Sequence, residues 1–254
     1  MSKALRAIGF GLAGWLLLAG CSSGGKVSPD QKRADIFEEA GHSALREGNY
    51  SDAMRSFHSA AKLNPSSPSL QVSLGIAYAG RGETKLAEEA FLKALKIDPK
   101  TTYARFNLGL LYLKHNRLLE AEKQLKIAAE DLVFLEIEKV HYNLAAVYTK
   151  MRKPMMVEQQ LRLALKANPD YCPANYHLGK ILRERDDFQG AAQHLAKSVN
   201  GICYNNPQIH YEIGTLLLKN KETDRAKAKL LDVIQLFPAS DWAKKAEVTL
   251  NMIR

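Results

Sequence analysis

The sequence predicts an all-α protein, an α-solenoid in which a helix-turn-helix unit is repeated about six times. Two observations support this prediction. Pro65 and Pro99 lie 34 residues apart, and each closes a stretch with the same order of small and large apolar residues. Glycine or alanine also recurs in one column of every stretch, where the two helices of a pair would cross closely. A single pair cannot bury its own apolar face, so the pairs are expected to stack into one continuous core.

The first 20 residues are typical of an export signal. Basic residues precede an apolar run, residues 7–18, which is too short to span a bilayer as a stable helix. The run ends in Leu18-Ala19-Gly20-Cys21, which resembles the lipobox of bacterial lipoproteins. That resemblance implies that residues 1–20 are removed and that the thiol of Cys21 carries diacylglycerol. The alternative is an uncleaved anchor with a chance cysteine.

Residues 21–33 are predicted to form a lipidated flexible tether. Small polar residues, Ser22-Ser23-Gly24-Gly25, follow the cysteine and cannot bury enough apolar surface to order themselves. Aspartate after the lipidated cysteine is the familiar signal for retention at the inner membrane. Because Ser22 stands there, the resemblance implies the periplasmic face of the outer membrane.

Six repeat units follow the tether. The second unit presents the columns Leu74, Gly75, Tyr78, Ala87, Phe91, Ala94 and Pro99. These residue types, in this order, resemble the tetratricopeptide repeat (TPR), which implies a right-handed superhelix of helix pairs. The predicted units are residues 34–67, 68–101, 102–135, 138–171, 172–205 and 207–239, so that the repeats together occupy residues 34–239. Glu136 and Ile137 form a short insertion between the third and fourth units.

Residues 240–254 are predicted to form a helix that caps the solenoid. Ser240 suits the N-cap position, because its hydroxyl can accept a hydrogen bond from a backbone N–H of the first turn. Trp242, Ala246 and Leu250 share one face of this helix, and charged residues occupy the other. Such a helix covers the apolar face that the last repeat would otherwise expose.

No motif of enzymatic chemistry stands out. The formal net charge of +9 is spread among acidic neighbours, so we interpret it mainly as solvated helix surface, with an acidic partner or an anionic membrane as the alternative. The sequence has neither a His-Glu-x-x-His motif nor a phosphate-binding glycine loop. Glu138 and His141 have the spacing of one half of a di-iron site, but no second copy exists. We therefore expect no enzyme, no catalytic residue, no metal, no cofactor beyond the lipid on Cys21, and neither a small-molecule substrate nor a nucleic acid as partner.

Cys172 and Cys203 are the cysteines that remain once Cys21 is lipidated. An exported chain meets oxidising conditions, and both residues lie near the same edge of the predicted fifth unit, so a disulfide between them is one hypothesis. Loop-entropy models give such a closure about 3 to 4 kcal/mol. Two unpaired thiols are the alternative, because the sequence does not show whether the α-carbons come within about 7 Å.

The candidate binding surface is an apolar strip on the second and third units. By resemblance to other TPR solenoids, the first helix of each unit lines the concave face. Applied to this sequence, that rule exposes Val72, Ile76, Tyr103, Phe106, Leu110 and Leu113. An exposed apolar strip usually marks a contact surface, so we expect it to bind an apolar peptide or helix of a partner. The alternative is that superhelical curvature or the tether fills the groove and that these residues are core.

From Cys21 to the C-terminus the chain resembles the outer-membrane pilotin lipoproteins of type IV pilus systems, the PilF, PilW and Tgl group. The lipobox, about six TPR units, the divergent junction at residues 131–138 and the runs at residues 104–109 and 142–169 carry this resemblance. It implies that the protein helps a secretin, the channel through which the pilus emerges, to reach the outer membrane and multimerise. The alternative is a lipoprotein adaptor for peptidoglycan hydrolases or another envelope complex. An envelope enzyme would need a cleft of convergent polar groups, which the sequence does not indicate.

Overall fold

The computed structural model describes residues 28–199 and 206–253, and this part of the chain contains thirteen α-helices. The helices are α1 (Pro29–Arg46), α2 (Tyr50–Leu63), α3 (Pro68–Arg81), α4 (Thr84–Ile97), α5 (Thr102–Lys114), α6 (Leu118–Ala129), α7 (Ile137–Lys150), α8 (Pro154–Ala167), α9 (Cys172–Glu184), α10 (Phe188–Ser198), α11 (Pro207–Lys219), α12 (Thr223–Leu236) and α13 (Asp241–Met252). No strand occurs within these residues. The predicted signal sequence and the predicted lipidation site, Cys21, lie outside the described residues.

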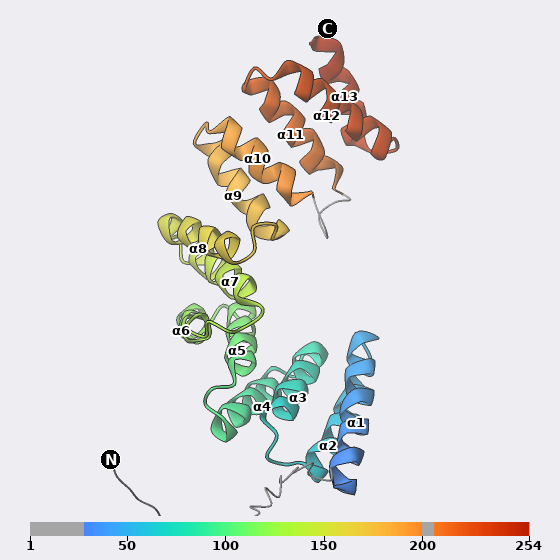
Figure 1. The fold of residues 1–254 in the computed structure, drawn as a ribbon, viewed down its shortest axis with the longest axis vertical. Coiled ribbons are helices and arrows are strands. Elements are labelled where there is room, and N and C mark those ends of the chain that lie inside the picture. Colours follow the sequence, from blue (N-terminus) through green and yellow to red (C-terminus); the bar gives the residue numbers. More distant parts are fainter. Residues whose placement is uncertain (1–27, 200–205, 254) are drawn as a thin grey trace, which may run out of the picture.

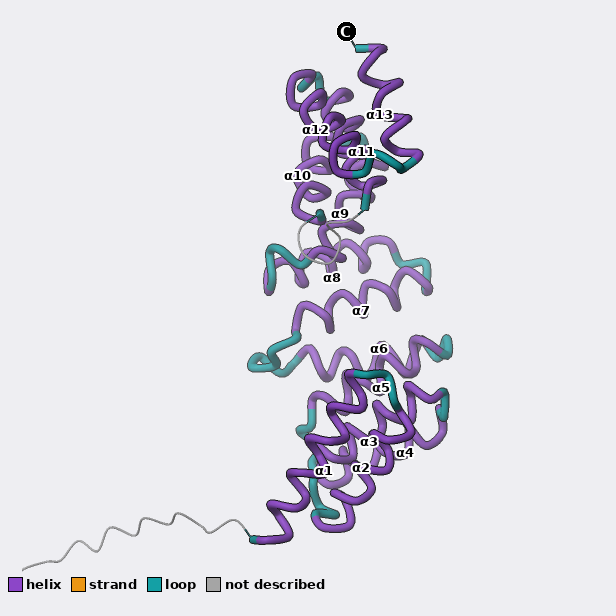
Figure 2. The backbone as a smooth tube through the Cα atoms, turned by 90° about the vertical axis from the view of Figure 1, so that its right-hand side faces the viewer, coloured by secondary structure: helices purple, strands orange, loops and turns teal. Residues whose placement is uncertain are grey.

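Consecutive helices form antiparallel pairs that stack along one axis. Each odd-numbered helix up to α11 packs against the helix that follows it, and each pair then packs against the next pair. Figure 1 shows this progression from α1 and α2 at one end to α13 at the other, and Figure 2 shows the same elongated stack from the side. Helix α13 packs on α12 and α11 and buries Ala246. The predicted all-α TPR array with a capping helix is therefore confirmed.

The close crossing of each pair depends on one column of small residues. Gly75 in α3 faces Phe91 in α4 so closely that a β-carbon on Gly75 would lie 2.4 Å from the phenyl ring. The same 16-residue offset joins the glycine to its partner in four other pairs, which are Gly41 with Phe57, Gly109 with Leu125, Gly179 with Leu195, and Gly214 with Leu230. In the fourth pair Ala145 replaces glycine and shares a buried cluster with Leu161. The repeat in the sequence is thus a repeat of one interhelical contact.

The first helix begins earlier than the sequence indicated. Residues 29–33, which we assigned to the tether, belong to α1. Pro29 occupies the first turn, where no backbone N–H partner is needed, and the Ser28 hydroxyl accepts a hydrogen bond from the Gln31 N–H at 3.1 Å. The assignment to the tether was wrong because a local cap, rather than the repeat period, decides where this helix starts.

Neighbouring repeats are also joined by polar contacts at partly buried carboxylates. Glu88 accepts hydrogen bonds from the Tyr112 hydroxyl at 2.8 Å and from the Arg117 guanidinium at 2.8 Å. The Arg117 guanidinium carbon also lies 4.1 Å from the centre of the Tyr112 ring. One repeat further on, the Tyr148 hydroxyl donates to Glu122 at 2.9 Å. A tyrosine in the first helix of one unit thus binds a glutamate in the second helix of the preceding unit.

Because of these contacts, we expect the free energy of unfolding to decrease in acid. Hydrogen bonds from Arg117 hold the pKa of Glu88 below its usual 4.5, so folding favours the ionised form. That contribution is present above the unfolded-state pKa and is lost as the pH falls through the lower folded-state value. We expect Glu88→Gln to cost about 1 kcal/mol at pH 7, typical of a favourable, partly exposed ion pair. In urea unfolding followed by circular dichroism, the wild type and the variant should converge as the pH falls below 4.5 and through the lower folded-state pKa of Glu88. An equal difference at pH 7 and in acid would contradict the role of the charge.

Candidate protein-binding site

A groove with a volume of about 700 Å³ lies between the first three repeats and the loop that follows them. We call it the N-terminal groove. The loop, residues 130–136, connects α6 to α7. The apolar part of the lining comes from α3, α5 and this loop, and includes Val72, Ile76, Tyr103, Val133, Phe134 and Leu135. Helix α1 contributes the polar side chains of Glu38 and His42.

Three of the six predicted binding residues line this groove. Val72, Ile76 and Tyr103 do so, and Ile76 and Tyr103 are exposed. Val72 is only 6% exposed, so little of its side chain is available to a partner. The predicted strip is therefore only partly an open surface.

The prediction that Phe106 is exposed was wrong. Phe106 is 6% exposed and belongs to the main hydrophobic core. Leu110 and Leu113 are partly buried against that core and are absent from the lining of the N-terminal groove. The rule uses only the position of a residue within its own helix. It therefore cannot predict that a side chain is buried by another segment of the chain.

The covering residue is Phe134 in the 130–136 loop. Its ring centre lies 4.8 Å from that of Tyr103, in an edge-to-face arrangement, and 5.9 Å from that of Phe106. Such aromatic pairs add about 0.5 to 1.5 kcal/mol beyond the area they bury. Phe134 is itself buried. The protein thus fills part of the predicted groove with its own side chain.

The same loop exposes three large apolar side chains. Leu132, Val133 and Leu135 are 93%, 84% and 87% exposed. Asp131 positions the loop, because its carboxylate accepts hydrogen bonds from the Thr102 hydroxyl and from the Val133 N–H. From the sequence we interpreted this junction only as a divergent insertion. The signal that could have identified it is the run of four apolar residues, Leu132 to Leu135, outside the repeat columns.

The other predicted sites are structural or lie outside the described residues. His141 makes a 2.8 Å hydrogen bond from Nδ1 to the side-chain oxygen of Gln160 in α8, so it takes part in the contact between α7 and α8. The described residues contain no cluster of three metal-binding side chains. None of their helices is long and apolar enough to cross a membrane.

Cys172 is buried at the start of α9, and its Sγ lies 2.9 Å from the carbonyl oxygen of Ser198 at the end of α10. Cys203 lies outside the described residues, so the pairing stays a prediction. Ser198 precedes Cys203 by five positions. Since a chain can span about 3.3 to 3.6 Å per residue, Cys203 is within reach of Cys172.

We expect a Cys172–Cys203 disulfide to stabilise the protein by about 3 kcal/mol, because it restricts the unfolded chain. Mass spectrometry after alkylation should detect no free thiol on either residue until reductant is added. Urea unfolding should show the same loss of stability on reduction as in a Cys203→Ser variant. Alkylation of both residues without reductant would contradict the pairing.

The stacked helix pairs, with their repeated close crossing, define a TPR protein. The tetratricopeptide repeat family matches residues 39–101 and, through a second form of the repeat, residues 209–240. The chain is 26% identical over 231 residues to the type IV pilus assembly protein PilF of Pseudomonas aeruginosa, a match that covers 88% of this chain and 90% of PilF.

Solved structures show the same fold. A structure described as a functional characterisation of Pseudomonas aeruginosa PilF superposes with a TM-score of 0.72 at 22% identity, covering 87% of this chain and 100% of the other. PilW, described as a widely conserved type IV pilus biogenesis factor, superposes with a TM-score of 0.65 at 18% identity, covering 84% of this chain and 97% of PilW. This chain is therefore a TPR protein similar to PilF and PilW over most of its length.

Proposed function

We propose that this protein is a non-enzymatic scaffold for type IV pilus biogenesis that binds a secretin subunit and promotes its localisation or multimerisation. A lipid on Cys21 would hold it at the periplasmic face of the outer membrane. The similarity to PilF and PilW over most of the chain supports this proposal. The lipid would anchor the protein in the membrane, and the TPR surface would bind the partner. This function requires no catalysed reaction.

The main support for a binding role is the set of exposed apolar side chains in the 130–136 loop, beside the N-terminal groove. Leu132, Val133 and Leu135 are held in place by Asp131 and by the buried Phe134. Complete burial of a leucine or valine side chain contributes about 1.5 to 3 kcal/mol, so a partner that covers these three would gain substantial affinity. An ordered loop that exposes such residues is typical of a contact surface.

The test is deletion of the gene, followed by immunoblotting of unheated envelope fractions for secretin multimers and by an assay of twitching motility. We expect the deletion to lose the multimers and the wild-type gene to restore them. A variant with Leu132→Ser, Val133→Ser and Leu135→Ser should fail to restore them, although it accumulates and folds normally, because these side chains make few contacts within the chain.

A matched variant controls for the loss of exposed apolar surface in general. Leu119, Leu231 and Val248 are exposed on α6, α12 and α13, away from the groove. Their replacement by serine should leave the secretin multimers intact. Normal multimers in the loop variant would overturn the binding site, whereas normal multimers in the deletion strain would overturn the function itself.

The anchor is tested separately with a Cys21→Ser variant. We expect this protein to lose acylation by mass spectrometry and to leave the outer-membrane fraction, with the repeats still folded. Retention of the variant in that fraction would show that the lipid is not the anchor.

A further inference from the structure

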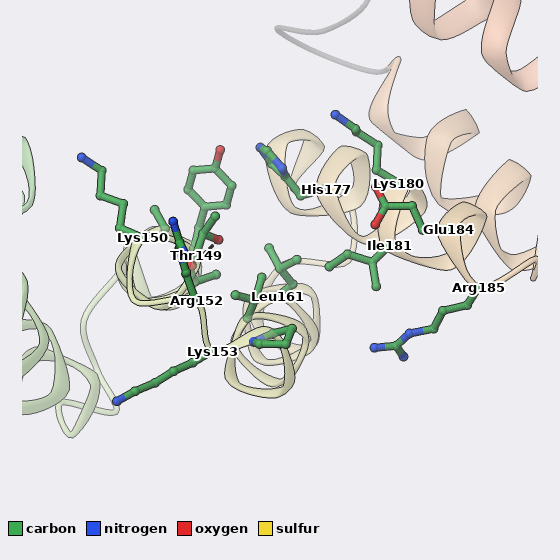
Figure 3. A pocket seen from close by; sticks show the side chains of 15 residues that line it. Thr149, Lys150, Arg152, Lys153, Leu161, His177, Lys180, Ile181, Glu184 and Arg185 are labelled. Atoms are coloured by element: carbon green, nitrogen blue, oxygen red, sulfur yellow. Dashed lines mark hydrogen bonds between the residues drawn. The ribbon is translucent and has the colours of Figure 1, made fainter.

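A second groove, separate from the N-terminal groove, lies between α7, α8 and α9 and has a volume of about 840 Å³. We call it the α7–α9 groove. Figure 3 shows its side chains, with Leu161 at the centre and Ile181 beside it. The floor is apolar and is formed by Tyr142, Ala145, Ala146, Val157, Leu161 and Ile181. It is therefore suited to hold one apolar side chain of a ligand.

Cationic side chains surround this floor. The lining contains Lys150, Arg152, Lys153, Lys180 and Arg185, against the single carboxylate of Glu184. In Figure 3, Lys150 and Lys153 extend outward from the α7 side, while Lys180 lies above His177 on the α9 side. The positive charges thus come from both walls of the groove.

One of these five cations forms an ion pair with a carboxylate of the described residues. Arg185 forms an ion pair with Glu158 at 2.6 Å. Among the described residues, no carboxylate forms an ion pair with the other four cationic side chains. Lys153 and Lys180 instead lie 5.8 Å and 5.5 Å from the ring centres of Tyr148 and Tyr176. Burial, and to a lesser extent the Lys180 ammonium, lower the pKa of His177 from 6.5, which favours its neutral form.

Arg152 lies in the turn between the two helices of the fourth repeat, at a position with a left-handed backbone. In most repeats this position holds glycine, asparagine or aspartate, which tolerate that conformation. The φ angle of Arg152 is 56°, and the same turn position in the other five repeats holds Gly48, Gly82, Asn116, Asp186 and Lys221, all with positive φ. A left-handed conformation is less favourable for a residue with a β-carbon than for glycine. In the fourth repeat this position carries a long cation that lines the groove.

We propose that the α7–α9 groove binds an acidic peptide segment of a partner protein. Carboxylates of the segment would pair with Lys150, Arg152 and Lys180, and one apolar side chain would pack on Leu161 and Ile181. Charge complementarity favours this occupant over the chain's own N-terminal residues 22–28, whose only ionisable side chain is Lys26. It also favours a peptide over a nucleic acid, because the cations surround a compact apolar hollow rather than follow an extended track. This site lies beyond the proposed secretin contact and uses none of its residues.

The test measures fluorescence anisotropy of labelled synthetic peptides with the full-length lipoprotein in detergent. The probe is a short peptide of glutamates and aspartates around one leucine. We expect saturable binding that weakens with salt, and loss of affinity when the leucine is replaced by serine or the acids by lysine. Arg152→Gly should weaken binding about tenfold, because it removes a charge-assisted hydrogen bond between the guanidinium and a carboxylate of the peptide. Lys180→Gln should act in the same direction.

Arg152→Gly removes a left-handed arginine, so its folding should be retained or improved. Lys221→Gly is the matched control, because Lys221 has the same backbone conformation in the sixth repeat and lies outside the groove. It should leave peptide affinity unchanged. Equal affinity of the wild type and Arg152→Gly, or an equal loss in Lys221→Gly, would overturn the proposal. So would equally tight binding of a leucine-free polyglutamate or of single-stranded DNA, because either would indicate attraction of any polyanion.

Discussion

Gly75→Ala is expected to lower the free energy of unfolding by about 2 to 3 kcal/mol, although alanine is the better helix former. The added methyl carbon would lie 2.4 Å from the Phe91 ring, and Phe91 is buried and cannot swing away. The two helices of the second repeat must therefore separate, which loosens their packing against both neighbouring repeats. Urea unfolding followed by circular dichroism measures the loss.

Gly190→Ala is the matched control for that substitution. Gly190 also lies in a helix, but the nearest atoms that a methyl group there would meet belong to the side chain of Asp187, the N-cap residue that accepts a hydrogen bond from the Gly190 N–H. The gain in helix propensity partly offsets the weakened cap, so the net loss should stay within about 1 kcal/mol. Similar losses in the two variants would mean that the crossing of α3 and α4 is not what requires glycine.

Phe134→Ala is expected to lower the free energy of unfolding by about 3 kcal/mol and to abolish the restoration of secretin multimers. Burial of its ring against Tyr103 and Phe106 holds the 130–136 loop on α5. Truncation of a core phenylalanine usually costs about 3 to 5 kcal/mol, and relaxation of the loop should keep the loss at the lower end. Protection of the loop amides in hydrogen exchange and the immunoblot of unheated envelopes measure the two effects.

The Phe134→Leu variant tests whether the size of the buried side chain is enough to position the loop. Leucine keeps most of the apolar volume, so this variant should lose about 1 kcal/mol and retain the multimers. The triple serine variant of the loop should show the opposite combination, normal stability with lost multimers. If Phe134→Ala weakened the fold and left the multimers intact, the position of the loop would not matter for the partner.

The fold was predictable from the sequence because the residues that specify it are close together in the chain and recur in every repeat. The Gly75 and Phe91 columns recur with the same 16-residue offset, and each occurrence describes the same crossing of two adjacent helices. Ser240 likewise identified the start of α13, where its side chain accepts a hydrogen bond from the Ala243 N–H at 3.1 Å. Contacts between neighbouring units of a solenoid need little information about distant parts of the chain.

The binding surface was only partly predictable, because exposure is decided by what covers a residue. Ile76 and Tyr103 line the N-terminal groove, but Phe106 does not, since Phe134 comes from the junction outside the repeat columns and packs on it. The α7–α9 groove was missed for a similar reason, because Arg152 and Lys180 lie 28 positions apart in the sequence and the packing of α9 on α8 brings them to one groove. By itself the sequence determined the repeat, its number and its capping helix. Only the tertiary structure decided which apolar side chains stay exposed and which charges meet, because both depend on contacts between segments that share no local pattern.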